Sequence, residues 1–312
     1  MLAEYGLIPD IFEPATYSSP EVCDLRLSSL KEVVMRQGLV RDFRQGEWQA
    51  YVAKRAERWD KRAKELVRKL VDQKRLVGST AVLPNVPTNE VEWCREALAS
   101  HKATPLTGIV TGKETAAHFE GEGAVSSIER LETAAWWHTN DETVHLARRT
   151  EEYLKHLSLI LRHANLLRFI DPHLDPSRGG YSEFIRLLLT ARRSGSCTPR
   201  IQIHRVCYVG HGPARRVLNQ KEWQEAFESL QPPLVSTGLS ADVFIWDDFH
   251  DRYLLTNLIG ILMGNGFDVS QASNAMTTWA RLSRNDRWRV EREFDYPNNA
   301  FHQLHGKFTI GR

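Results

Sequence analysis

The residues from 250 to 257 combine side-chain types that suit phosphate chemistry. His250 and Arg252 stand two positions apart, and Asn257 follows five residues later. We expect a β-strand over 250–256, and side chains two apart on a strand point to the same face. An imidazole can act as a nucleophile or a general acid–base, and a guanidinium offers a fork of donors to phosphate oxygens. The spacing predicts a phosphodiester site; the alternative, polar residues on a solvated strand, stays open.

A glycine cluster follows this segment. Gly264 and Gly266 let a backbone approach a ligand closely, because glycine carries no Cβ. Asp268 is a candidate carboxylate for the same site. Asp171 and His173 fall at the end of an expected strand, where ligands gather in α/β folds. We expect these five residues to bind substrate, with ordinary turns as the alternative.

The segment resembles the signature of the phospholipase D superfamily, His-x-Lys-x4-Asp-x6-Gly-Ser-x-Asn. This chain keeps the register as His250-x-Arg252-x4-Asn257-x6-Gly264, with Arg in place of Lys and Asn in place of the acid. The serine and asparagine that follow the glycine in the family are not in place. The resemblance implies a phospholipase D-like α/β sandwich half-domain over 151–312. It also implies a homodimer, because two half-sites meet in that family and each supplies a histidine.

The resemblance leaves two functions open. In the first, His250 attacks phosphorus to form a phosphohistidine, Arg252 stabilises the developing charge, and Asn257 takes the place of the orienting acid. That implies a phosphodiesterase, and more narrowly a DNA nuclease, which needs no metal and no cofactor. In the second, the module is inactive and binds nucleic acid or a partner protein within a larger complex. An Asp-to-Asn change in a comparable His–Asp pair costs about 10⁴ in rate, which favours the second function. Proteins of this kind occur in prokaryotic restriction and antiviral defence.

The expected elements divide the chain into two domains. Residues 1–150 are expected to be mainly helical, with the strongest amphipathic helix over 47–76, and to serve docking or nucleic-acid binding. A long helix over 141–167, opened by a capping box at Thr139, leads into the second domain. Residues 151–312 alternate between strands and helices and end in a helix over 274–293. The expected fold class is therefore α/β, with a helical N-terminal domain before the phospholipase D-like half.

Basic residues are concentrated in the helix predicted over 47–76. Ten Lys and Arg against four Asp and Glu between 54 and 75 give a local charge of +6. Such a face can follow the phosphates of a nucleic acid, and a solvated helix with internal ion pairs is the alternative. The candidates for nucleic-acid contacts are Lys54, Arg58, Lys61, Arg62, Arg68 and Lys69.

Two other groupings suggest chemistry but are not expected to provide it. His204, Cys207 and His211 hint at zinc, yet the first two face opposite sides of a strand and no fourth ligand is close. We therefore expect no metal. His305 and Lys307 repeat the His-x-Lys pattern, but they lie too near His250 in sequence for a second half-domain.

Composition bounds the remaining function classes. The 312 residues are 42% hydrophobic and 26% charged, with a net charge of +2, so any basic surface is local. The four cysteines stand far apart, which fits a reducing cytosol. The sequence shows no signal-peptide pattern and no apolar run long enough for a membrane span, so we expect a cytoplasmic protein.

Overall fold

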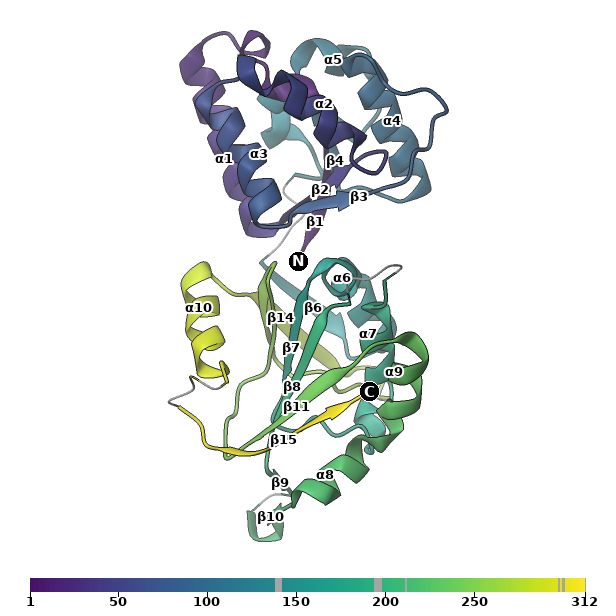
Figure 1. Ribbon diagram of the computed structural model, residues 1–312, viewed down its shortest axis with the longest axis vertical. Helices are drawn as coiled ribbons and strands as arrows, with labels where there is room; N and C mark the ends of the chain where they lie inside the picture. The colour runs from purple at the N-terminus through teal and green to yellow at the C-terminus, as the bar shows by residue number, and fades with distance from the viewer. Residues whose placement is uncertain (138–141, 194–197, 211, 297, 299–300, 312) are drawn as a thin grey trace. The chain divides into compact units, whose positions relative to one another are not determined.

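A computed structural model describes the chain except residues 138–141, 194–197, 211, 297, 299–300 and 312. The chain forms two compact units, Leu2–Asp141 and Glu142–Arg312, and Met1 belongs with the second (Figure 1). Both units mix helices with sheets, which confirms the α/β class.

The N-terminal unit contains a five-stranded parallel sheet in the order β3-β2-β1-β4-β5. The prediction of a mainly helical domain missed this sheet. Helices lie on both of its sides, with α1 and α3 together and α4 and α5 opposite (Figure 1). The strands are β1 Ala3–Leu7, β2 Gly38–Asp42, β3 Leu76–Gly78, β4 Gly108–Thr111 and β5 Val125–Ser127. The α-helices are α1 Pro20–Gln37, α2 Glu47–Arg55, α3 Lys61–Asp72, α4 Glu90–Ala103 and α5 Lys113–Ala117.

The central strands were missed because they carry charges in the core. Every residue of β1 and β2 is buried, so neither strand shows the apolar–polar alternation of a half-exposed strand. Glu4 of β1 and Arg41 of β2 neutralise each other through an ion pair of 2.7 Å between Nε and Oε1. Ion pairing offsets the cost of burying these two charges. The local sequence around either residue does not predict the pairing.

The predicted helix over 47–76 is in fact broken near its middle. The first helix, α2, ends at Arg55, and Trp59 has an extended backbone. Asp60 then caps α3, its carboxylate accepting a 2.6 Å hydrogen bond from the Arg62 N–H. The Trp59 ring stacks on Phe12 at 5.0 Å, so core packing fixes the bend.

The C-terminal unit is built on an eight-stranded mixed sheet in the order β15-β11-β8-β7-β12-β13-β14-β6. Strands β7, β8 and β11 are parallel, and the other pairs are antiparallel. Helices α6, α7 and α9 lie on one side of the sheet and α10 on the other (Figure 1). The strands are β6 Thr143–Ala147, β7 Leu166–Ile170, β8 Arg200–Val206, β11 Ala241–Trp246, β12 Tyr253–Thr256, β13 Gly260–Met263, β14 Met276–Arg281 and β15 Leu304–Ile310, with a small ribbon of β9 Tyr208–Val209 and β10 Arg216–Val217. The α-helices are α6 Thr150–His163, α7 Phe184–Thr190, α8 Gln220–Phe227, α9 Gln231–Thr237 and α10 Arg284–Glu293.

Two predicted helices of this unit each prove to be a strand followed by a helix. The helix expected over 141–167 is β6 followed by α6, and the capping box at Thr139 lies outside the described residues. The helix expected over 274–293 is β14 followed by α10. Both strands pair with each other at the edge of the sheet, a contact that no local pattern predicts.

Candidate functional site

A cavity of about 250 Å³ lies at one edge of the C-terminal sheet. The carboxyl ends of β7, β8 and β13 meet there with the amino end of β12, because β12 runs antiparallel to its neighbours. Strand ends are the usual place for ligands in such sheets. The lining residues are His173, Arg178, Tyr181, Arg205, Tyr208, Val209, Gly210, Arg252, Asn265 and Asp268.

A buried carboxylate, Asp171, ties the segments of this site together. It accepts hydrogen bonds from the backbone N–H groups of His173 at 2.9 Å and Phe267 at 3.1 Å, and from the Tyr181 hydroxyl at 3.1 Å. Its Oδ1 lies 3.7 Å from Arg252 Nε. Complete burial raises the pKa of Asp171, whereas the hydrogen bonds and Arg252 oppose that shift. Asp171 thus acts beneath the pocket as a support for Arg252.

Gly266 is required at the point where the chain passes Asp171. Its φ is +71°, and a Cβ built there would lie 2.0 Å from Asp171 Oδ2. The close backbone approach expected of this glycine is therefore made to a carboxylate of the protein itself. Gly264 packs instead against β14, where a Cβ would lie 2.9 Å from the Thr278 carbonyl oxygen.

Three arginines line the pocket. The Arg252 side chain is 27% exposed, and Arg178 pairs with Asp175 at 3.1 Å. Arg205 is buried, with its guanidinium 3.5 Å from the Trp223 ring centroid and hydrogen bonds to three backbone carbonyls. Burial lowers the pKa of Arg205 to about 9, so the side chain stays protonated at neutral pH.

Sequence reasoning missed Arg178, Arg205, Tyr181, Tyr208 and Asn265 as pocket residues. Arg178 had a local signal, because it precedes a Gly-Gly pair in the loop after a strand. Arg205 had none, because an arginine within a strand is ordinarily assigned to its solvated face.

His250 and Arg252 lie in the loop before β12, so the prediction that both stand on one strand is wrong. His250 is exposed and does not line the cavity, whereas Arg252 does. The two residues still touch, since Arg252 Nη1 donates to the His250 carbonyl oxygen at 3.4 Å. His250 is thus exposed and is joined to Arg252 through its backbone carbonyl.

Asn257 lies at the opposite end of β12 from Arg252. Its Oδ1 accepts hydrogen bonds from the backbone N–H groups of Asn165 at 2.7 Å and Leu166 at 3.2 Å, where β7 begins. Five residues of extended chain separate Asn257 from Arg252 by roughly 16 Å. The structure brings Asp171, His173, Gly266 and Arg252 together and leaves Asn257 apart.

Asp268 lines the cavity and forms an ion pair with Arg148. Its backbone carbonyl accepts a 2.8 Å hydrogen bond from the Tyr153 hydroxyl. Burial raises the pKa of Asp268, and Arg148 opposes that shift.

His204 and Cys207 belong to the core. The His204 ring is completely buried and stacks on Phe244 at 4.8 Å, and its Nδ1 accepts a 3.0 Å hydrogen bond from Trp246 Nε1. Burial holds the pKa of His204 well below its usual range. His211 lies outside the described residues, and among those described no group of three His, Cys, Asp or Glu side chains could hold a metal ion.

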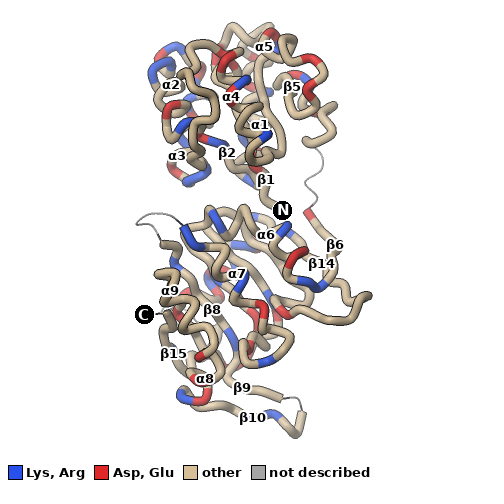
Figure 2. The backbone as a smooth tube through the Cα atoms, turned by 90° about the vertical axis from the view of Figure 1, so that its right-hand side faces the viewer, with Lys and Arg blue, Asp and Glu red and all other residues tan. Residues whose placement is uncertain are grey.

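The basic candidates of the N-terminal unit are not equally available to a ligand. Figure 2 shows Lys and Arg along α2 and α3. Arg62 and Lys69 form ion pairs with Glu65 at 3.3 and 3.1 Å. Exposed positions are those of Lys54, Arg58, Lys61 and Arg68.

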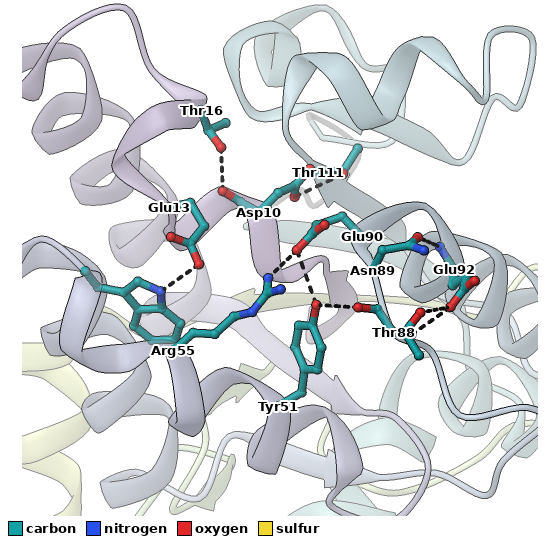
Figure 3. A network of polar contacts seen from close by, with 11 residues as sticks. Asp10, Glu13, Thr16, Tyr51, Arg55, Thr88, Asn89, Glu90, Glu92 and Thr111 are labelled. Carbon is teal, nitrogen blue, oxygen red and sulfur yellow. Dashed lines mark hydrogen bonds and ion pairs between the residues drawn. The ribbon is translucent and has the colours of Figure 1, made fainter.

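A polar network gathers at the carboxyl ends of β1 and β4 in the same unit (Figure 3). The Thr111 hydroxyl donates to Asp10 at 3.0 Å, Arg55 pairs with Glu90, and the Tyr51 hydroxyl donates to the Thr88 carbonyl at 3.2 Å. Burial raises the pKa of Asp10. These groups satisfy one another, which makes the network a support for the sheet edge.

Comparisons with known proteins find no matching family model and no matching curated protein. Among solved structures, polyphosphate kinase from Porphyromonas gingivalis aligns at 12% identity and a TM-score of 0.33, over 49% of this chain and 25% of the kinase. The chain thus spans about a quarter of that kinase's length. TrmBL2, an archaeal chromatin protein that binds DNA, aligns at 13% identity and a TM-score of 0.31, over 80% of this chain and 86% of that protein. Separately, no helix in the described part of the chain is long and apolar enough to cross a membrane.

Proposed function

We propose that the C-terminal unit binds a phosphate group of a phosphodiester in the pocket around Arg252. The observation that carries the proposal is the convergence of Arg178, Arg205 and Arg252 on one small cavity at a sheet edge. A planar guanidinium is the side chain best shaped to share two hydrogen bonds with phosphate oxygens. The resemblance of the segment from His250 to Gly264 to a phospholipase D signature supports the same ligand class.

The buried Asp171 explains how such a pocket is held ready. Its carboxylate fixes Arg252 on one side and the Phe267 backbone on the other. Arg252 therefore keeps its orientation without a ligand, which reduces the side-chain entropy lost on binding.

Binding is tested with a short oligonucleotide and isothermal titration calorimetry. We expect Arg252→Ala to weaken binding at least about tenfold, because a hydrogen bond to a charged group contributes about 1.5–3 kcal/mol. Arg252→Lys keeps the charge and should fall between wild type and Arg252→Ala. Lys221→Ala on α8, whose side chain is 85% exposed, serves as the control for loss of a positive charge. If Arg252→Ala and Lys221→Ala bind the oligonucleotide with equal affinity, the pocket is not the phosphate site.

A second candidate function is metal-independent phosphodiester cleavage by His250. The observation that favours it is the exposure of His250 two residues before Arg252, whose guanidinium donates to the His250 backbone carbonyl. In this mechanism His250 of one chain attacks phosphorus, and the histidine of a second chain protonates the leaving oxygen. DNA is the substrate we propose for this activity.

Cleavage is tested on end-labelled single- and double-stranded DNA and RNA in the presence of EDTA. An active phosphodiesterase should cut under chelation and lose that activity in His250→Ala, while Lys221→Ala keeps it. If wild type and His250→Ala both bind the oligonucleotides and neither cleaves them, the chain remains a phosphate-binding module that serves a larger complex.

A further inference from the structure

The solvent face of α10 carries cations around one exposed aromatic ring. Arg284, Trp288 and Arg292 follow one another at intervals of four residues and so lie on the same side of the helix. Arg289 adjoins Trp288, and all four residues are exposed. Arg289 pairs with Asp286 at 3.5 Å, so Arg284 and Arg292 are the cations that this face offers beside the indole.

The acidic residues of α10 bind groups other than Arg284 and Arg292, and Asp286 pairs with Arg289 at 3.5 Å. Asp286 binds the Ser283 hydroxyl at the start of the helix, Glu291 pairs with Arg287 at 2.7 Å, and Glu293 binds His302 at 2.9 Å. Within the described part of the chain, neither Arg284 nor Arg292 forms an ion pair with a carboxylate. The outward face is therefore cationic, although the helix as a whole is nearly neutral.

Trp288 differs from the other tryptophans in its exposure. All nine lie in the described residues, and Trp288 has the exposed side chain, at 59%, whereas the other eight are buried or half-buried. The Arg292 guanidinium lies 4.9 Å from the ring centroid. An exposed indole backed by a cation offers a surface on which a flat, electron-rich group can stack.

The helix lies beside the segment that carries the candidate site. Phe294, directly after α10, packs on Phe249 at 5.0 Å, next to His250. The charges of Glu293 and Arg289 act on the Tyr253 hydroxyl at the beginning of β12. The carboxyl end of α10 and the loop with His250 and Arg252 are thus neighbouring parts of one unit.

We propose that α10 binds single-stranded nucleic acid, with one base stacked on Trp288 and flanking phosphates on Arg284 and Arg292. Stacking requires a base that is not already paired and stacked, so a single strand should bind better than a duplex. Cations without facing carboxylates suit a polyanion better than a mixed-charge protein surface. The proposal rests on the proposed function only for the further step, in which the strand continues to the Arg252 pocket.

The test uses the full chain and the fluorescence of its tryptophans. Adding oligothymidylate should quench the emission selectively from Trp288. Trp288→Ala should weaken binding roughly 5- to 150-fold, the effect of losing one base–aromatic stack, and Trp288→Phe should restore part of it. Arg284→Ala with Arg292→Ala should reduce the slope of log K against log salt by about 1.4, at about 0.7 per phosphate contact. Lys221→Glu on α8 is the matched charge control.

The outcomes separate this proposal from the proposed function. Weakened binding in Trp288→Ala, together with phosphate binding unchanged in Arg252→Ala, would support the α10 surface and overturn the pocket. Equal affinity of Trp288→Ala and Lys221→Glu would overturn the α10 surface and leave the pocket standing. Equal quenching by duplex and single strand would also overturn it. So would a change from dimer to monomer in Trp288→Ala, because the face would then join two copies of the chain.

Discussion

At the scale of single residues, the core of the C-terminal unit holds a histidine, His204, whose burial lowers its pKa well below the usual range. His204 packs against the rings of Phe244 and Trp246 and accepts a hydrogen bond from Trp246. Besides burial, the charge of Arg168 lowers the pKa of His204. Burial of His204 therefore makes the stability of the fold depend on pH, although His204 takes no part in the pocket.

We expect His204 to destabilise the fold as the pH falls below about 6.5. The unfolded chain takes up a proton near the ordinary histidine pKa, whereas the folded pKa lies well below it, so stability is present above that pH and is lost below it. Relative to His204→Gln, the free energy of unfolding of the wild type should fall by up to about 1.4 kcal/mol per pH unit. Urea denaturation between pH 5 and 8 measures both slopes. If the free energy of unfolding has the same pH dependence in wild type and His204→Gln, the lowered pKa of His204 is contradicted.

Gly266 gives a second prediction at this scale. Gly266→Ala must place a methyl group against Asp171 at a positive φ, so we expect a loss of about 1–3 kcal/mol in the free energy of unfolding together with weaker phosphate binding. Gly123→Ala is the control, because nothing lies within 4 Å of a Cβ there. Thermal and urea denaturation measure the difference. If Gly266→Ala leaves the free energy of unfolding unchanged, the chain can relax around Asp171.

At the scale of elements, Arg252 and Asn257 belong to one sequence motif but lie at opposite ends of β12 and have different contacts. The amino end of β12 leads from the loop that carries Arg252 to the pocket, and after its carboxyl end Asn257 holds the start of β7. An amide oxygen and a carboxylate oxygen can both accept these backbone hydrogen bonds. An asparagine at the position where the phospholipase D signature has an acid is thus compatible with an intact fold.

Substitution of Asn257 distinguishes support from catalysis. Asn257→Ala leaves two backbone N–H groups without their acceptor, so the free energy of unfolding should fall by about 1–3 kcal/mol. Asn257→Asp should remain within about 1 kcal/mol of wild type and should leave oligonucleotide affinity unchanged. Denaturation and calorimetry measure these two quantities. A gain of DNA cleavage in Asn257→Asp would instead assign a catalytic part to the acid.

At the scale of the whole molecule, each unit has its own sheet and core. A net charge of +2 is too small to attract a polyanion as a whole, so nucleic-acid binding must rest on local faces. The described candidates are the exposed cations of α2 and α3 in one unit and of α10 in the other. The proposed cleavage adds a requirement, since a chain with one motif needs a second copy.

Mixing wild type with His250→Ala tests that requirement. If each active site takes one histidine from each of two chains, an equal mixture at constant total concentration should keep about a quarter of the wild-type cleavage rate, because random pairing makes wild-type dimers one time in four. A site contained in one chain would keep about half. Sedimentation analysis of the same samples reports whether dimers form.

Much of the second unit follows from local pattern. The sequence predicts strands over 167–171 and 242–246 and helices over 182–191 and 220–230. These ranges agree within a few residues with β7, β11, α7 and α8. The parallel sheet of the first unit was not predicted, because its central strands are buried on both faces and include the ion pair of Glu4 and Arg41. Strands β6 and β14 escaped because their hydrogen bonds are made to each other across more than a hundred residues.

The sequence by itself determined the mixed α/β class and the candidate residues His250, Arg252, Gly266 and Asp171, since residue type and spacing are local properties. Tertiary structure decided which of them meet. Pairing of β12 with β7 put Arg252 over Asp171 and moved Asn257 to the other end of the strand. Packing of Phe294 on Phe249 set α10, with Trp288 on its exposed face, beside the same loop. Long-range contacts of this kind are fixed by burial and pairing in the folded state, which no short stretch of sequence contains.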